Sequence, residues 1–222
     1  MPMLLFDIDG TLIRSGGAGK LAMERGLKSA FAIDEVRDEV PYAGRTDRGI
    51  GFDLLRANGL DKTEANLQAL QSAYLAALPG SLTELGGTIC SGIPTILDEL
   101  AERDDVQLGL LTGNTLAGAR IKLTHFGLWH HFACGGYGDD HHERDDVARS
   151  AVQAMRLHVK RDIDRSELWV IGDTPLDIQC GRAIGATVVA VATGWHPIDE
   201  LRHADHVFAD LSEVDGFLSL LR

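Results

Sequence analysis

Hydrophobic positions along most of the chain form short apolar runs, which alternate with longer segments whose apolar residues recur at helical spacing. The apolar runs are MLLF, QLGLLT, LWVIG and TVVAVA. The segments with helical spacing are 115–126, 145–157 and 176–184. This alternation is typical of buried parallel strands linked by crossover helices. The pattern therefore predicts an α/β fold with a doubly wound, Rossmann-like parallel sheet, completed by a strand near 206–208 and a helix over 211–221.

The interval from about residue 15 to about residue 86 breaks this alternation, because it follows helical spacing throughout and contains no predicted strand. Its clearest helical segments are 20–31, 48–58 and 62–78. An all-helical insertion after the first strand predicts a second domain over 15–86, inserted into an α/β core made of 1–14 and 87–222. The glycine-rich sequences SGG and LGG at its two ends suit hinges that let the insertion move.

Composition and charge narrow the class of protein. The chain has 222 residues, of which 45% are hydrophobic and 24% charged, as expected for a soluble globular protein with one large core and a smaller second domain. Its formal charge is −12, which disfavours attraction to nucleic acid or to an anionic membrane, so neither is expected as a partner. An anionic substrate would therefore need local cations or a metal.

The cysteines and the first residues indicate a compartment. Three widely spaced cysteines without a CxxC pair fit a reducing environment. The first apolar run is interrupted at Asp7, too early for a signal peptide or a membrane span. A cytoplasmic location is expected from these features.

Polar residues follow three of the predicted strands at their carboxyl ends. They are Asp7, Asp9, Gly10 and Thr11 after the first run, Thr112, Gly113 and Asn114 after the second, and Asp173 and Asp177 after the third. Because ligands of a doubly wound sheet bind beyond the carboxyl ends of its strands, we expect these segments to converge on one crevice. A single aspartate after a strand is usually a turn or a helix cap. The combination found here is hard to attribute to chance.

Carboxylates gathered at one edge of a sheet repel one another unless a cation neutralises them. Magnesium prefers carboxylates, carbonyls, waters and substrate phosphate as ligands. These strand ends carry neither cysteine nor histidine, which argues against zinc. The sequence therefore predicts a Mg²⁺ site near Asp7 and Asp173.

The segments FDIDGTL, LLTGN and IGDTPLD resemble the first, second and fourth motifs of the haloacid dehalogenase-like hydrolase superfamily. The resemblance spans nearly the whole chain and includes a helical cap inserted just after the first motif, as in the phosphoglycolate phosphatase and β-phosphoglucomutase branches. It implies a small-molecule phosphate monoester as substrate, Mg²⁺ as cofactor and an aspartyl-phosphate intermediate.

The resemblance also implies a role for each matching residue. Asp7 is expected to attack phosphorus, and Asp9 to protonate the leaving alcohol and then to activate water, with its backbone carbonyl touching the metal. The expected phosphate-binding groups are those of Thr112, Gly10, Thr11, Gly113 and Asn114. The expected metal ligands are Asp7, Asp9, Asp173 and Asp177, the last directly or through water.

The third motif of the family is a lysine or arginine that neutralises charge on the phosphoryl group and the nucleophile. Its common Lys-Pro form is absent here. Lys160 and Arg161 fall late in a helical pattern, where a solvated helix end is the better interpretation. Arg144 follows the strand-like FACGGYG and precedes a helix, in a GDD-x-x-x-R arrangement similar to that of other capped family members. We assign the third-motif role to Arg144.

Two further segments have competing interpretations. The stretch DDHHERDD at 139–146 could suggest a transition-metal site, but adjacent histidines in a turn diverge and lack a second ligand pair. In the cap, Gly44-Arg45-Thr46-Asp47 is similar to loops of capped relatives that contact the part of the substrate remote from phosphate. Arg45 is the specificity candidate there, and an ordinary helix start is the alternative.

The motifs leave more than one function open. Hydrolysis and mutase transfer use the same aspartyl phosphate and differ in whether the cap admits water or a second sugar hydroxyl. Hydrolysis of a small phosphate monoester is preferred, because it is the broader of the two activities. A non-catalytic phospho-ligand-binding protein on this fold would be expected to lose Asp7, Asp9 or Asp173, and a signalling receiver domain is shorter and lacks a cap. The oligomeric state stays open.

Overall fold

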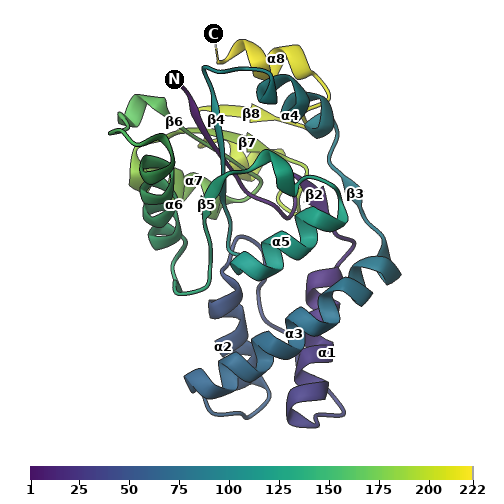
Figure 1. The fold of residues 1–222 in the computed structure, drawn as a ribbon. Coiled ribbons are helices and arrows are strands. Elements are labelled where there is room, and N and C mark those ends of the chain that lie inside the picture. Colours follow the sequence, from purple (N-terminus) through teal and green to yellow (C-terminus); the bar gives the residue numbers. More distant parts are fainter. Residues whose placement is uncertain (222) are drawn as a thin grey trace.

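The computed structural model describes residues 1–221 and contains a six-stranded parallel sheet in the order β5-β4-β1-β6-β7-β8 (Figure 1). The strands are β1 (Met3–Phe6), β4 (Gln107–Leu111), β5 (Cys134–Gly136), β6 (Leu168–Gly172), β7 (Thr187–Val191) and β8 (His206–Phe208). All of their pairings are parallel. The predicted doubly wound α/β fold is therefore confirmed.

Helices cover both faces of this sheet, because successive side chains of each strand point to opposite sides. Leu4 and Phe6 belong to one hydrophobic cluster, whereas Met3 and Leu5 belong to another. The first cluster includes residues of α4 (Ile93–Ala101), α5 (Leu116–His125) and α8 (Val214–Ser219). The second includes residues of α6 (Arg144–Val159) and α7 (Pro175–Ile184). Burial on both faces explains the unbroken apolar runs of the strands.

The interval predicted as a helical insertion contains α1 (Ala18–Phe31), α2 (Asp47–Ala57) and α3 (Glu64–Leu85), which lie in the lower part of Figure 1. These helices pack around a hydrophobic cluster of their own, which includes Leu27, Leu54 and Leu70. The predicted third helix is extended at its C-terminal end, because it continues through Pro79 to Leu85 with buried anchors at Ser81 and Leu82.

A short antiparallel pair, β2 (Ile13–Arg14) with β3 (Thr88–Ile89), joins the two connections between the insertion and the sheet. Two residues per strand carry no readable periodicity, so the sequence does not predict this pair. The remaining elements are short 3₁₀ turns at Trp129–His131, Arg165–Glu167 and Ile198–Leu201. Across residues 1–221, every helix is too short or too polar to span a bilayer.

The register of the central strands sets the position of the site. Phe6, the last residue of β1, is level with Leu110 of β4 and Ile171 of β6. The residues that follow these three strands therefore leave the sheet side by side, at the edge where the strand order reverses around β1.

Candidate active site

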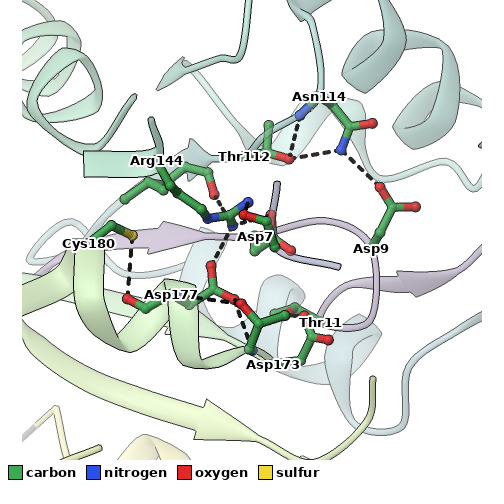
Figure 2. Close-up of polar contacts among 12 residues, drawn as sticks. Asp7, Asp9, Thr11, Thr112, Asn114, Arg144, Asp173, Asp177 and Cys180 are labelled. Carbon is green, nitrogen blue, oxygen red and sulfur yellow. Dashed lines mark hydrogen bonds and ion pairs between the residues drawn. The ribbon is translucent and has the colours of Figure 1, made fainter. Parts of the chain in front are cut away.

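Three aspartates from two strand ends meet at this edge of the sheet (Figure 2). Asp7 follows β1, Asp173 follows β6, and Asp177 lies in the first turn of α7. All three are buried, and each offers a carboxylate oxygen within 4.8 Å of the others. The hydroxyl of Thr11 donates to Asp173 Oδ1 at 3.1 Å. The sequence-predicted carboxylates are thus brought together, with the exception of Asp9.

The backbone of Gly10 passes directly against Asp173. Its φ is +90°, and a Cβ at this position would lie 2.3 Å from Asp173 Oδ2. Gly10 therefore combines a left-handed turn with a close approach that a larger residue could not make. The loop after β7 makes a similar approach on the other side, because a Cβ on Gly194 would lie 1.7 Å from the same oxygen.

Asp177 is held by the start of its own helix. Thr174 is the N-cap of α7 and accepts from the backbone nitrogen of Asp177, while Asp177 Oδ2 accepts from the nitrogen of Thr174 at 3.0 Å and from its hydroxyl at 2.8 Å. This reciprocal pair is a capping box. The sequence TPLD thus places a fully buried carboxylate in the site through local helix-capping chemistry.

Arg144 lies between two of these carboxylates (Figure 2). Its Nη2 lies 2.7 Å from Asp7 Oδ1 and also pairs with Asp177 Oδ1. Burial by itself would lower the pKa of this guanidinium, but Asp177 and Asp7 raise it well above its ordinary value. The Nε atom of Arg144 is buried without a hydrogen-bond partner in residues 1–221.

One arginine does not neutralise three buried carboxylates. Burial raises the pKa of Asp7 to about 6 despite the opposing charge of Arg144. Burial, with Asp177 and Asp7 nearby, raises the pKa of Asp173 well above its ordinary range. An all-oxygen donor set with excess negative charge fits a hard divalent cation such as Mg²⁺.

Asp9 points away from this group, toward Asn114 (Figure 2). Its Oδ2 accepts from Asn114 Nδ2 at 2.8 Å and lies 2.6 Å from the ammonium of Lys122, which also donates to Asn114 Oδ1 at 2.6 Å. Ser15 donates to its other oxygen at 3.4 Å. Burial raises the pKa of Asp9, but Lys122, Asn114 and Ser15 outweigh it and hold the pKa below its ordinary value.

Lys122 is a residue of the site that sequence reasoning missed. It lies on α5 outside every motif, and it is only 4% exposed. Its neighbours at helical spacing, Gly118 and Ala119, are also buried. A lysine on the apolar face of a helix that follows the second motif is the signal that could have identified it.

The loop after β4 connects the site to the insertion. Thr112 is fully buried, and its hydroxyl accepts from Asn114 Nδ2 at 2.9 Å. The carbonyl of Gly113 accepts from the backbone nitrogen of Asp47 at 2.7 Å, and a Cβ on Gly113 would lie 2.0 Å from the Arg45 carbonyl. Gly113 therefore permits close contact between the insertion and the sheet edge.

Arg45 lines the cavity above the carboxylates, but its guanidinium pairs with Asp53 at 2.8 Å. The neighbouring Thr46 caps α2 by accepting from the nitrogen of Gly49, and its hydroxyl donates to the carbonyl of His142 at 3.2 Å. Thr46 therefore fits the interpretation of this segment as an ordinary helix start. The specificity role of Arg45 stays a prediction.

The remaining basic candidates lie on the surface. Lys160 ends α6 in a left-handed conformation and is exposed. Arg161 is also exposed and pairs with Glu167 at 2.7 Å. His142 accepts from Arg48 Nε at 3.3 Å and stacks on Phe52. Among residues 1–221, the group of acidic, histidine or cysteine side chains close enough to share a metal consists of the three aspartates and includes neither His141 nor His142.

The fold and the site together define an α/β enzyme with a carboxylate-rich centre at its strand ends. The family model described as haloacid dehalogenase-like hydrolase matches residues 4–182, so the chain belongs to that family. The resemblance inferred from the motifs is thereby confirmed.

Relatives align with nearly the whole chain. It is 25% identical to a phosphoglycolate phosphatase of Rhodobacter capsulatus, over 98% of this chain and 96% of the relative. It is 27% identical to a phosphoglycolate phosphatase of Pectobacterium atrosepticum, over 97% and 93% of the two chains. The crystal structure of CbbY from Rhodobacter sphaeroides in complex with phosphate shares the fold, with a TM-score of 0.77 at 18% identity over 96% of each chain. The expectation of a phosphatase of this family is confirmed.

Proposed function

We propose that the protein hydrolyses a small-molecule phosphate monoester with Mg²⁺, through an aspartyl phosphate on Asp7. The observation that carries this proposal is the position of Asp7, which pairs with Arg144 at 2.7 Å and shares one cluster with Asp173 and Asp177. A carboxylate nucleophile is thus adjacent both to a cation that can neutralise a phosphoryl group and to a set of metal donors.

Arg144 provides the charge that phosphoryl transfer requires. When Asp7 attacks phosphorus, negative charge accumulates on the phosphoryl oxygens, and a guanidinium already held beside the nucleophile stabilises it without reorganisation. Its unpartnered, buried Nε supplies a donor for a phosphoryl oxygen. Thr112 and the backbone amides of Gly10, Thr11, Gly113 and Asn114 are proposed to contact the remaining oxygens.

The proposed metal site consists of Asp7, Asp173 and the backbone carbonyl of Asp9. When bound, Mg²⁺ would neutralise carboxylate and phosphate charge. Both oxygens of Asp177 already accept hydrogen bonds, from Arg144 and from Thr174. We therefore assign Asp177 an indirect role, in which it orients Arg144 and reaches the metal through water.

Asp9 is proposed to protonate the leaving alcohol and then to take a proton from the attacking water. Lys122 and Asn114 fix its carboxylate in one orientation through contacts of 2.6 and 2.8 Å. We assign Lys122 the part of a positioning residue for this acid and base.

We also infer that residues 15–86 act as a cap. They have their own hydrophobic cluster, and they touch the sheet edge through hydrogen bonds at the loops after β4 and β5. A cap that closes over the carboxylates would exclude bulk water during phosphoryl transfer.

The experiment that tests this proposal is turnover of p-nitrophenyl phosphate and 2-phosphoglycolate with and without Mg²⁺. Asp7→Asn should abolish turnover with little change in thermal unfolding, and retained activity would overturn the assignment. Addition of a sugar bisphosphate to a sugar monophosphate assay separates the two reactions, because a mutase would form an isomeric sugar phosphate and a phosphatase would release inorganic phosphate.

A further inference from the structure

The cavity above the carboxylates is large for the smallest phosphate esters. Its volume is about 810 Å³, and it is bounded by Asp7, Asp9 and Asp173 on one side and by the insertion on the other. Pockets of about 300–1,000 Å³ hold drug-sized ligands. A phosphate group with a two-carbon acid would leave most of this space to water.

The part of the cavity lining that comes from the insertion includes apolar and aromatic side chains. They are those of Met23, Tyr42, Ile50 and Tyr74, and they occur together with the charged residues Lys20, Arg45 and Asp47. Four cations that line the cavity pair with protein carboxylates: Lys20 with Asp38, Arg45 with Asp53, Lys122 with Asp9 and Arg144 with Asp7. A fifth, Arg14, donates to the carbonyl of Thr193. The apolar and aromatic part of the lining suits a leaving group with an apolar surface.

Trp195 lies at the mouth of the same cavity and is 91% exposed. By contrast, Trp129 and Trp169 pack against the hydrophobic core. Within residues 1–221, neither an aromatic ring nor a cation stacks on the Trp195 indole. An aromatic face is therefore presented to whatever enters the cavity.

The backbone that carries Trp195 is fastened to the site. The hydroxyl of Thr193 donates to the carbonyl of Gly10 at 2.5 Å, and Arg14 Nε donates to the carbonyl of Thr193 at 2.5 Å. Gly194, the residue before Trp195, packs closely against Asp173. The backbone at Trp195 is therefore fixed in position next to the carboxylate cluster, although the indole itself is exposed.

Tyr42, a residue of the insertion that lines the same cavity, adds an independent observation. Its hydroxyl oxygen is buried and has no hydrogen-bond partner in residues 1–221. A buried hydroxyl without a partner is unfavourable. A polar atom of a ligand in the cavity would satisfy it.

We propose that Trp195 and Tyr42 form a subsite for a flat, unsaturated ring in the leaving group, with the ring face on the indole and a polar ring atom at the Tyr42 hydroxyl. The substrate is then a ring-bearing phosphate monoester and not a two-carbon acid phosphate. This inference rests on the proposed phosphatase function, since it concerns the leaving group of that reaction.

The test compares kcat/KM within matched pairs of esters that differ in the ring. Benzyl phosphate carries a planar ring, whereas cyclohexylmethyl phosphate carries a puckered one. Uridine 5′-monophosphate differs from ribose 5-phosphate by its planar base, which lies farther from phosphorus than the benzyl ring does. We expect the flat-ring member to be preferred by roughly tenfold in at least one pair, as one stacking contact provides. Trp195→Ala should remove the preference and Trp195→Phe should restore it. Tyr42→Phe should lower kcat/KM for uridine 5′-monophosphate more than for benzyl phosphate.

The control is Leu157→Ala, which truncates a side chain that is 70% exposed on α6 and is not part of the cavity lining. It should leave the ratio within each pair unchanged. A second readout is binding to the Asp7→Asn protein, in which the preferred flat-ring ester should quench tryptophan fluorescence and its ringless or puckered partner should not. Equal kcat/KM within both pairs, or a preference that survives Trp195→Ala, would overturn the subsite and leave the phosphatase assignment intact. Activity that survives Asp7→Asn would overturn that assignment itself.

Discussion

The ammonium of Lys122 lies 2.6 Å from Asp9 Oδ2, and both groups are held by the same Asn114 side chain. Lys122 comes from α5 and Asp9 from the loop after β1, so the contact joins segments separated by 113 positions. A lysine is buried here beside the carboxylate proposed to transfer protons.

Replacement of Lys122 by Met should lower kcat/KM selectively, because Asp9 would lose the contact that fixes it. With alkyl phosphates, whose leaving group needs a proton, we expect a loss of about 10²–10⁴-fold, the usual contribution of a general acid. With p-nitrophenyl phosphate, whose nitrophenolate leaves without a proton, the loss should be much smaller. Lys122→Arg should retain most of the activity on alkyl phosphates, because it keeps a cation beside Asp9. Equal losses on both esters would show that Lys122 does not act through Asp9.

Replacement of Arg144 by Ala should reduce turnover by about 10²–10³-fold, the loss typical of removing one preorganised charge-stabilising donor. It also leaves Asp7 and Asp177 without their cation. Arg144→Lys should recover only part of the activity, because an ammonium cannot reproduce the guanidinium fork. The matched control is His142→Ala in the loop just before α6, because the His142 imidazole contacts Arg48 and Phe52 rather than the carboxylates. A large loss from the histidine and none from the arginine would reverse the assignment.

Mg²⁺ should raise the thermal unfolding temperature of the protein, because a cation that binds only the folded state stabilises it by mass action. Asp173→Asn should weaken this dependence on Mg²⁺ concentration and shift the activity to higher Mg²⁺. In metal-free buffer the same variant should be more stable than the wild type, since it removes one of three clustered negative charges. Differential scanning fluorimetry over a Mg²⁺ series checks both expectations. An identical Mg²⁺ response in the two proteins would contradict the proposed metal site.

Asp47 should make stability depend on pH. Burial raises its pKa to about 6, although Lys122 and the backbone nitrogen of Thr115 oppose the shift. Because the folded-state pKa lies above the unfolded value of 3.8, the favourable contribution is complete below pH 3.8 and is lost as pH rises through about 6. Asp47→Asn should therefore gain stability relative to the wild type between pH 4 and pH 7, by about 1–3 kcal/mol.

Urea unfolding of both proteins across this pH range measures that difference. A suitable control is Asp105→Asn, because Asp105 is a surface residue whose pKa is held below its ordinary value by Arg103. It should show no such gain on raising the pH. A wild-type and Asp47→Asn pair with parallel stability curves would refute the assignment of a raised pKa to Asp47.

Local sequence was sufficient for the sheet and for most of the carboxylates of the candidate site. MLLF and LWVIG are buried on both faces, so their unbroken hydrophobicity identified them as parallel strands. Parallel strands direct their carboxyl ends to one edge, and for this reason Asp7 and Asp173 could be predicted to meet. The TPLD capping box is equally local, and it explains why Asp177 reaches the same point.

Residues whose roles depend on contacts between distant segments could not be predicted in this way. A lysine on the buried face of α5 is unusual, but only the packing of α5 brings Lys122 against Asp9. The strand pair β2–β3 is too short to leave a pattern. The exposure of Trp195 at the cavity mouth depends on hydrogen bonds that fasten Thr193 to Gly10 and Arg14.

The sequence by itself determined the fold class, the family and the carboxylate cluster, because these follow from periodicity and from residues placed next to strand ends. Only the tertiary structure decided that Asp9 faces Lys122 rather than the other aspartates, and that Trp195 and Tyr42 face one cavity. The physical reason is that strand and helix patterns report which face of an element is buried. They do not report which side chain from a distant element lies against it.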